Sequence, residues 1–382
     1  MKIVLFFGTR PEAIKLAPLI KALEKSSGMF EPVSCAVAQH RHMLDHVLEL
    51  FAIKPAYDLD IMEPDQSLFD VSVKGLLAIK AVLQQEMPAL VVVQGDTTTT
   101  FIASLASFYL KIPVGHVEAG LRTLEKYRPF PEEINRRLTT HIADLHFAPT
   151  DGAKQNLRAE GIREEDIVVT GNTVIDALLM ITDTLKSPEK QKALEHYFKG
   201  EWDITFSDKK KTILVTGHRR ESFGKGLENI CLALKHIAQH EENLQIIYPV
   251  HLNPNVQKQV KKTLRDTENI HLIEPLEYDV FVYVMNRSYV ILTDSGGIQE
   301  EAPSLGKPVL VMRQETERPE GVKAGVSKVV GTDTECIVRE VGVLLHDKNE
   351  YEKMSNPANP YGDGRASEKI ITAIRHYCKK GE

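Results

Sequence analysis

Short apolar runs rich in Val, Ile and Leu alternate with longer amphipathic stretches along almost the whole chain. Runs of this length between turn residues predict buried parallel strands, and the amphipathic stretches predict helices. In the first half we expect strands at 2–7 and near 32–38, 90–94, 113–117, 145–148 and 167–170, and helices over 11–26, 68–85, 98–110, 133–143 and 151–160. This alternation predicts an α/β fold with a doubly wound parallel sheet.

The second half repeats the pattern of the first. Each opening run is followed by Gly, one polar residue, Arg, and a Glu two residues later, with Gly8 and Gly217 in equivalent places. Further strand or helix segments are expected at 212–216, 227–240, 245–250, 270–273, 289–293, 298–305 and 308–312. A connecting helix over 174–185, a polar, charged connection over 186–211 and a last helix over 366–377 complete the pattern. Because 382 residues exceed one ordinary core, the repeat predicts two similar Rossmann-like domains.

Composition narrows the class of protein. The chain is 42% hydrophobic and 26% charged with a formal net charge of −6, so it lacks the basic excess of a nucleic-acid binder. It contains no apolar run of about 18 residues and no secretory signal at its start, and we expect no membrane segment. Its four cysteines are widely scattered, as reduced thiols would be. We therefore expect a cytoplasmic protein.

Three acidic residues stand where an α/β enzyme places its chemistry. Asp96 and Glu118 follow two successive predicted strands, and Glu132 lies at the next loop-to-helix start. Ligands of open α/β sheets bind outside the carboxyl ends of the strands, so carboxylates gathered there suggest proton transfer. Each acid taken singly is better explained as a helix cap or a surface residue, but three of them within 37 residues weaken that explanation.

The segment 294–301 gives the clearest sign of ligand binding in the second half. Gly296 and Gly297 open a predicted helix, where backbone N–H groups and the helix dipole attract an anion, and Glu301 is suited to the two hydroxyls of a ribose. The alternative is a Gly-rich turn capped by Asp294 or Ser295. The chain has neither G-x-G-x-x-G nor G-x-x-x-x-G-K-[ST], which disfavours NAD and P-loop ATP chemistry.

Basic residues cluster at the starts of the two opening helices. Arg10 and Lys15 flank the first, and His218, Arg219 and Arg220 follow the equivalent strand of the second half. Cations near a helix N-terminus oppose its dipole, so an anion between them would explain their place; surface pairing with glutamates is the alternative. His42 and His46 have i, i+4 spacing, but without a carboxylate-rich context we favour a solvated helix face over a metal site.

Several motifs together resemble those of the non-hydrolysing UDP-N-acetylglucosamine 2-epimerases. They are Gly8–Glu12, Gly95–Thr99, His116–Arg122, Pro131–Glu133, Gly171–Val174 with Asp176, Thr216–Glu221, Asp294–Glu301 and Asn359–Gly364. The resemblance implies a glycosyltransferase-B-like architecture: two Rossmann-like domains facing a cleft, with the last helix crossing back to the first. We place the domains at 1–172, joined by 365–382, and at 173–364. The resemblance also implies a homodimer that needs neither metal nor nicotinamide.

For function, the resemblance implies reversible epimerisation at C2 of UDP-N-acetylglucosamine to UDP-N-acetylmannosamine, through loss and re-addition of UDP with 2-acetamidoglucal between. It implies acid, base and charge-stabilising roles for Asp96, Glu118, Glu132, His218 and Arg136. It implies UDP and substrate binding by Arg10, Lys15, Asp96, Glu118, His218, Leu276, Phe281, Ser295, Gly296, Gly297, Glu301 and Arg318. The product would supply bacterial surface polysaccharide. A retaining glycosyltransferase, a hydrolysing epimerase and a silent nucleotide-sugar sensor are the alternatives.

Overall fold

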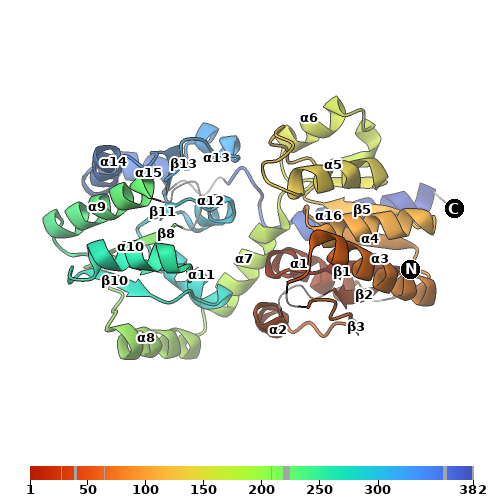
Figure 1. Ribbon diagram of the computed structural model, residues 1–382, viewed down its shortest axis with the longest axis horizontal. Coiled ribbons are helices and arrows are strands. Elements are labelled where there is room, and N and C mark those ends of the chain that lie inside the picture. Colours follow the sequence, from red (N-terminus) through yellow and green to blue (C-terminus); the bar gives the residue numbers. More distant parts are fainter. Residues whose placement is uncertain are drawn as a thin grey trace. The chain divides into compact units, whose positions relative to one another are not determined.

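Two parallel sheets with helices around them form the framework of the chain (Figure 1). A computed structural model describes residues 1–26, 28–37, 41–63, 65–207, 209–217, 224–355 and 359–380, with no side-chain description for 41–43 and 380. Contacts divide the chain into unit 1, Met1–Ala177 with Tyr361–Glu382, and unit 2, Leu178–Pro360. None of the described helices is long and apolar enough to cross a membrane.

The sheet of unit 1 has seven strands in the order β3-β2-β1-β4-β5-β6-β7, and every neighbouring pair is parallel. Its strands are β1 (Lys2–Phe7), β2 (Glu31–Ala36), β3 (Tyr57–Asp58), β4 (Leu90–Gln94), β5 (Val114–Val117), β6 (Leu145–Ala148) and β7 (Ile167–Val169). All residues of β4, β5 and β6 are buried, as the continuous apolar runs predicted.

The helices of unit 1 begin close to where the sequence predicted them, except for α2, whose bounds were not predicted. They are α1 (Arg10–Lys25), α2 (Arg41–Leu50), α3 (Leu68–Glu86), α4 (Thr98–Tyr109), α5 (Glu132–Ile142), α6 (Asp151–Ala159) and α16 (Ala366–Lys380), while α7 (Thr173–Thr184) begins in unit 1 and ends in unit 2. Four of them are capped by a hydroxyl that accepts a hydrogen bond from the backbone N–H three residues on, at Thr9, Ser67, Thr97 and Thr150.

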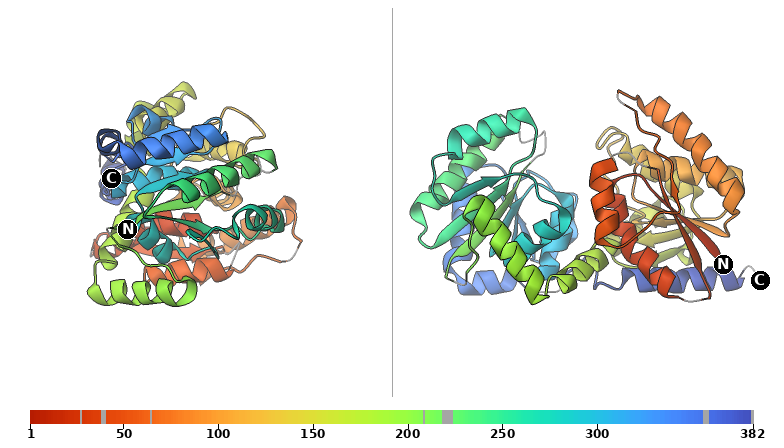
Figure 2. Two further views of the ribbon diagram at one scale, coloured as in Figure 1. Left: turned by 90° about the vertical axis from the view of Figure 1, so that its left-hand side faces the viewer. Right: turned by 90° about the horizontal axis from the view of Figure 1, so that it is seen from below.

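The last helix, α16, belongs to unit 1 although it ends the chain (Figure 2). It packs against α1. Asp176 on α7 accepts hydrogen bonds from the backbone N–H groups of Ala366 and Ser367, at 3.1 and 2.8 Å, and so satisfies donors at the start of α16. The predicted return of the final helix to the first half of the chain is confirmed.

The sheet of unit 2 repeats the topology with six parallel strands in the order β10-β9-β8-β11-β12-β13. Its strands are β8 (Lys211–Thr216), β9 (Leu244–Pro249), β10 (Ile270–Ile273), β11 (Val290–Thr293), β12 (Val309–Val311) and β13 (Ser327–Val329). Its helices are α8 (Pro188–Trp202), α9 (Lys225–His240), α10 (Pro254–Leu264), α11 (Tyr278–Arg287), α12 (Gly296–Glu301), α13 (Pro319–Lys323), α14 (Thr334–His346) and α15 (Lys348–Met354). The predicted α/β fold with two Rossmann-like sheets is confirmed.

Two local expectations were wrong. The polar connection expected over 186–211 contains the helix α8, whose apolar face consists of a few large rings rather than a regular stripe. Phe198 is fully buried there and packs against Phe206 and Tyr283. The helix expected over 298–305 ends at Glu301 and continues as a 3-10 turn over Ala302–Leu305, where Pro303 has no N–H to extend it.

Candidate active site

The carboxyl ends of β4 and β5 carry two of the three predicted acids. Asp96 follows Gly95 at the end of β4, and Glu118 directly follows β5. β4 and β5 are neighbours in register, with Gln94 opposite Val117, so the two loops leave the same edge of the sheet side by side. The sequence therefore placed both acids at the edge where α/β folds bind ligands.

Glu118 is held in a constrained, largely buried place. Its φ of 67° lies in the left-handed region that favours glycine, a cost that proteins accept mainly at functional sites. One carboxylate oxygen, Oε2, accepts hydrogen bonds from Lys15 Nζ at 2.5 Å and from Gln94 Nε2 at 2.7 Å. Only 7% of the Glu118 side chain and 16% of the Lys15 side chain are exposed, so this ion pair is shielded from water.

The turn after Glu118 is fixed by close packing. Gly120 has a φ of 92°, and a Cβ at this position would collide with the backbone carbonyl of Ala153 at the start of α6. A glycine is therefore required for the chain to pass this point.

The third acid, Glu132, is the first residue of α5, and Arg136 lies one turn later on the same face. Arg136 forms an ion pair with Asp96 and a longer one with Glu133 at 3.5 Å. Glu132 Oε2 is buried and has no hydrogen-bond partner within the described part of the chain. A buried carboxylate oxygen without a hydrogen-bond partner lowers the stability of the fold. A bound ligand that donates to this oxygen would explain why it is there.

A buried polar network behind these acids was missed from the sequence. Glu12 and His116 are each 1% exposed and Asn135 is 7% exposed. Burial lowers the pKa of His116 to about 3, so its ring is neutral at physiological pH. The Thr9-x-x-Glu12 pattern is the sequence signature of a capping box, and the structure has one at α1.

Unit 2 presents a different kind of edge after β11. Ser295 makes no side-chain hydrogen bond to cap α12, whose first two residues are Gly296 and Gly297. The backbone there is open to close approach, because a Cβ on Gly296 would lie 3.6 Å or more from the nearest atoms, those of the Arg318 guanidinium. Uncapped N–H groups beside a guanidinium suit an anion.

Arg318 and Glu301 lie close to this start of α12, and the other two predicted residues of unit 2, Phe281 and Leu276, belong to α11 and the connection before it. Arg318 forms an ion pair with Glu300, which is 2% exposed. Glu301 is buried, and its Oε1 accepts a hydrogen bond from the Tyr278 hydroxyl at 2.6 Å. Phe281 lies in α11 one turn after Tyr278, and Leu276 is half-buried in the connection that leads into that helix. Tyr278 is a further residue that sequence reasoning missed.

Some predicted residues cannot be placed with the others. His218, with Arg219 and Arg220, lies outside the described residues. Arg10 is the first residue of α1 and is half-buried. Within the described ranges, no group of three or more His, Cys, Asp or Glu side chains has the geometry to hold a metal ion; the side chain of His42 is not among those described.

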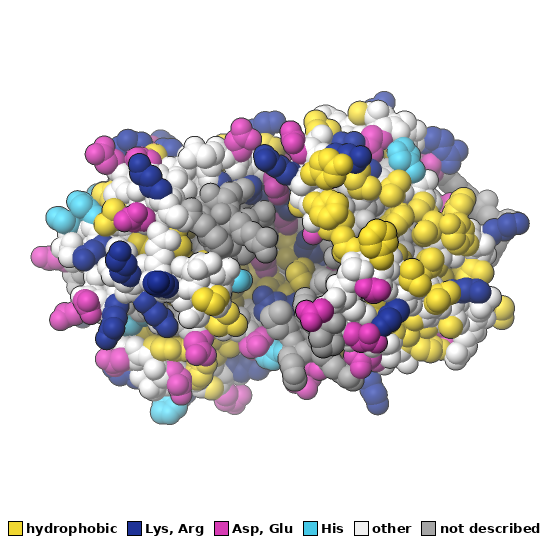
Figure 3. Space-filling view, viewed as in Figure 1, with side chains coloured by type: hydrophobic (Ala, Val, Ile, Leu, Met, Phe, Trp, Pro, Cys, Tyr) yellow, Lys and Arg dark blue, Asp and Glu magenta, His cyan; other side chains and the backbone are white. Residues whose placement is uncertain are grey.

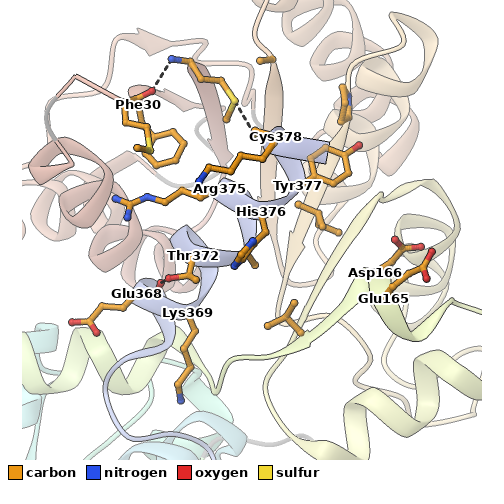
Figure 4. A pocket seen from close by; sticks show the side chains of 18 of the residues that line it. Phe30, Glu165, Asp166, Glu368, Lys369, Thr372, Arg375, His376, Tyr377 and Cys378 are labelled. Atoms are coloured by element: carbon orange, nitrogen blue, oxygen red, sulfur yellow. Dashed lines mark hydrogen bonds between the residues drawn. The ribbon is translucent and has the colours of Figure 1, made fainter. Parts of the chain in front are cut away.

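A wide hollow of about 1560 Å³ lies at the opposite edge of the unit 1 sheet (Figure 4). The amino ends of the strands, at Met1, Ala89 and Pro113, line it together with α16 residues such as Arg375 and His376. None of the predicted site residues is among the residues that line it. The size of a hollow therefore does not identify the candidate active site of this unit.

Comparison with known proteins agrees with the motifs. The family model described as UDP-N-acetylglucosamine 2-epimerase matches residues 21–375. A UDP-N-acetylglucosamine 2-epimerase of Salmonella typhimurium is 56% identical over 99% of both chains. The crystal structure of UDP-GlcNAc 2-epimerase from Neisseria meningitidis bound to UDP-GlcNAc has a TM-score of 0.91 at 50% identity and covers 98% of this chain and 100% of that one.

A glycosyltransferase from Rickettsia africae has a TM-score of 0.63 at 15% identity, covering 99% of this chain and 98% of that one, which shows a shared fold alone. The two Rossmann-like sheets are thus glycosyltransferase-B-like in architecture. With the family model and relatives above half identity over nearly the full length, the chain belongs to the UDP-N-acetylglucosamine 2-epimerase family.

Proposed function

We propose that the protein interconverts UDP-N-acetylglucosamine and UDP-N-acetylmannosamine without hydrolysing either. The observation that supports this most is the pairing of acids and cations at the carboxyl edge of unit 1, with Lys15 on Glu118 and Arg136 on Asp96. Membership of the epimerase family supplies the substrate class.

The reaction follows from the chemistry of C2, whose hydrogen is not next to a carbonyl. A base takes the C2 proton while the bond from C1 to the UDP oxygen breaks, so that a C1=C2 double bond forms and UDP leaves with the electron pair. In the return step a UDP oxygen adds to C1, and an acid delivers a proton to the opposite face of C2. Both steps need proton-exchanging groups and cations that stabilise the leaving diphosphate.

We assign the proton transfers to unit 1. Asp96, Glu118 and Glu132 are the carboxyl groups that this assignment uses, with Arg136 as a charge-stabilising group. The resemblance adds His218, which lies outside the described residues. Asp96 and Glu118 are ion-paired with Arg136 and Lys15, and the unpartnered oxygen of Glu132 leaves that group available to substrate. Metal and nicotinamide have no part in the proposed steps.

We assign recognition of UDP chiefly to unit 2. The N–H groups at Ser295, Gly296 and Gly297 and the guanidinium of Arg318 are suited to the diphosphate. Glu301, held by Tyr278, is suited to the ribose hydroxyls. Phe281 and the backbone near Leu276 are suited to the uracil, and Arg10 and Lys15 of unit 1 supply further positive charge.

One incubation tests the proposed function. Purified protein is mixed with UDP-N-acetylglucosamine alone, and the products are followed by nuclear magnetic resonance. We expect reversible formation of UDP-N-acetylmannosamine without free sugar. Release of free N-acetylmannosamine would indicate a hydrolysing enzyme, and unchanged substrate would indicate a transferase or a sensor; either result contradicts the proposal.

We also propose that the protein is a homodimer through one face of unit 1, formed by α3, α4, α5 and the loop 121–131. These helices pack side by side, and Figure 3 shows apolar side chains gathered over this part of the molecule. Ten large apolar side chains of these elements are at least 43% exposed: Leu68, Phe69, Val73, Leu77, Phe108, Tyr109, Leu124, Tyr127, Phe130 and Leu138.

The area of this face supports a second copy as its occupant. At about 150–250 Å² for a whole aromatic side chain, its five rings alone expose roughly 500–850 Å². The largest apolar patch of a monomer is typically about 300–600 Å², whereas a standard interface buries about 800 Å² per partner. A two-fold interface uses the same patch on both copies, and homodimer interfaces are the most apolar class.

Light scattering on the eluting protein tests this assembly. Phe69→Glu combined with Leu77→Glu should convert a dimer into a monomer, while Leu252→Glu, at an exposed apolar residue of unit 2, should leave the dimer intact. A wild type that is monomeric, or a double variant that stays dimeric, would contradict the interface.

We further propose the division into domains at 172–173 and 364–365, and cytoplasmic synthesis of N-acetylmannosamine units for surface polysaccharide.

A further inference from the structure

Glu12 carries out more than the capping of its own helix. It is the third residue of α1, and its Oε2 accepts hydrogen bonds from the backbone N–H groups of Gly8 at 3.0 Å and Thr9 at 2.7 Å. The Thr9 contact and the hydrogen bond from Glu12 N to the Thr9 hydroxyl, at 3.5 Å, form a capping box, for which a glutamine would serve equally well. The Gly8 contact is additional to that motif. A cap of this kind is ordinarily solvated, yet Glu12 is 1% exposed, and burial raises the pKa of its carboxyl against the opposing hydrogen bonds.

The second oxygen of Glu12 reaches a different loop. Oε1 accepts a hydrogen bond from the Thr97 hydroxyl at 2.6 Å, across 85 residues of sequence, and lies 3.2 Å from the Thr100 hydroxyl. Thr97 directly follows Asp96 and caps α4 by accepting from Thr100 N at 3.2 Å. The Thr100 hydroxyl in turn donates to the carbonyl of Gln94 at 2.6 Å. One buried carboxylate thus joins the loop after β1 to the loop after β4.

Two further buried side chains hold the backbone carbonyls that come directly before and after the Cα of Asp96. His116 Nε2 hydrogen-bonds to the carbonyl of Gly95 at 2.7 Å, and Asn135 Nδ2 donates to the carbonyl of Asp96 at 3.1 Å. Gly95 has a φ of 76°, so this turn departs from ordinary strand geometry. Three side chains from three elements are more than a β–α turn needs for its fold, and all three converge on the residues next to Asp96.

Glu12 also fixes the element that carries Lys15. The two residues lie three positions apart on α1, and Lys15 donates to Glu118 at 2.5 Å. A shift at the start of α1 relative to the loop after β4 would therefore change the spacing between the Lys15–Glu118 pair and the Asp96–Arg136 pair. In a site that moves protons, a displacement of about 1 Å is enough to cost roughly 100-fold in rate.

We propose that Glu12 is a positioning residue of the catalytic centre, acting through Thr97 to hold Asp96 at a fixed distance from the Lys15–Glu118 pair. This inference rests on the proposed function, because it assigns proton transfer to those acids. A carboxylate suits the place because every group it meets from the two loops is a donor. Glutamine at position 12 turns an amide N–H₂ toward either the backbone N–H pair or Thr97, and so reverses or breaks the link.

The test compares variants that remove the link with variants that remove only a helix cap. Glu12→Gln and Thr97→Val are expected to lower kcat by about 10- to 100-fold. Because the UDP-binding groups assigned to unit 2 are untouched, the Kd for UDP should stay within about twofold. Thr97→Ser keeps the hydroxyl and should restore kcat to near the wild-type value. Asp333→Ala removes the cap of α14 in unit 2 and should lower the melting temperature with kcat unchanged.

Amide hydrogen exchange of residues 94–98 gives a second readout that does not depend on activity. Exchange should quicken in Thr97→Val and stay near the wild-type rate in Thr97→Ser. An active wild type whose kcat is unchanged in both Glu12→Gln and Thr97→Val overturns the inference, as does a fall in kcat that Asp333→Ala shares. If Glu12→Gln does not fold, the comparison of Thr97→Val with Thr97→Ser tests the inference. If the wild type has no epimerase activity, the proposed function fails, and hydrogen exchange alone tests whether the Glu12–Thr97 hydrogen bond holds the loop.

Discussion

The two units share a strand order but place different chemistry after equivalent strands. In unit 1 the opening strand β1 lies beside β4, and in unit 2 the opening strand β8 lies beside β11. After β4, Thr97 caps α4 with its hydroxyl and Asp96 pairs with Arg136. After β11, Ser295 gives no side-chain cap and α12 begins with two glycines. One position in the fold therefore presents side chains in unit 1 and backbone in unit 2.

This difference fits the two tasks that the proposed function requires. Proton transfer needs charged side chains held in fixed positions, and the loop after β4 has a network of buried hydrogen bonds behind it. Binding a diphosphate needs N–H donors without obstructing side chains, and the start of α12 offers them. Under the proposed function, the repeated scaffold would separate rate from binding, and substitutions in the two units should affect different kinetic constants.

The largest effect is expected from the acids of unit 1. Asp96→Asn, Glu118→Gln and Glu132→Gln keep the shape of each side chain but remove its ability to transfer a proton. Each should lower kcat by roughly 10²–10⁴-fold, measured by steady-state kinetics with UDP-N-acetylglucosamine. Circular dichroism and the Kd for UDP serve as controls, since both should stay near the wild-type values. Full turnover in all three variants would contradict the assignment of proton transfer to unit 1 and UDP binding to unit 2.

A pH-dependent effect is expected from the buried imidazole behind Asp96. The pKa of His116 is about 3 in the folded chain and near 6.5 when unfolded, so only the unfolded state gains its proton between these values. The stability that this group contributes is present above pH 6.5 and is lost as the pH falls toward 3. The loss should approach about 1.4 kcal/mol of unfolding free energy per pH unit.

Urea denaturation of wild type and His116→Gln between pH 7 and pH 4 measures this contribution of His116 to the unfolding free energy. The variant lacks the titrating ring, so the difference in unfolding free energy between the two proteins should shrink as the pH falls. A difference that stays constant over this range would mean that His116 is not held neutral in the folded chain.

The smallest of the three effects is expected from Glu301 in unit 2. Glu301→Gln keeps the hydrogen bond with Tyr278 possible but weakens acceptance from ribose hydroxyls. In the proposed role, Glu301 would bind those hydroxyls alike in the ground and transition states, so the Kd for UDP and the KM should rise about 10-fold while kcat changes little. Calorimetry with UDP gives the first quantity and steady-state kinetics the other two. A kcat loss as large as in the acid variants would place Glu301 with the proton-transfer groups instead.

The sequence predicted what local patterns control. The helices α3 and α4 start at the predicted residues because Ser67 and Thr97 are strong N-caps, and Asp96 and Glu118 stand at strand ends as the apolar runs indicated. The helix α8 was missed because its buried face rests on a few aromatic rings.

Long-range pairs were beyond such reasoning. Lys15 meets Glu118 across 103 residues and Glu12 meets Thr97 across 85, and both contacts exist because β1, β4 and β5 are neighbours in the sheet. Local sequence identifies Glu12 as part of a capping box, but only the strand order shows which loop its second oxygen reaches.

The central claim is that the carboxyl groups of unit 1 exchange protons at C2. The most direct measurement is the reaction of wild-type protein with UDP-N-acetylglucosamine in heavy water, followed by proton nuclear magnetic resonance and mass spectrometry of both nucleotide sugars. The account predicts UDP-N-acetylmannosamine carrying deuterium at C2, with the incorporation slowed in Asp96→Asn, Glu118→Gln and Glu132→Gln but not in Glu301→Gln at saturating substrate. Epimerised product that keeps its original hydrogen at C2 would contradict it.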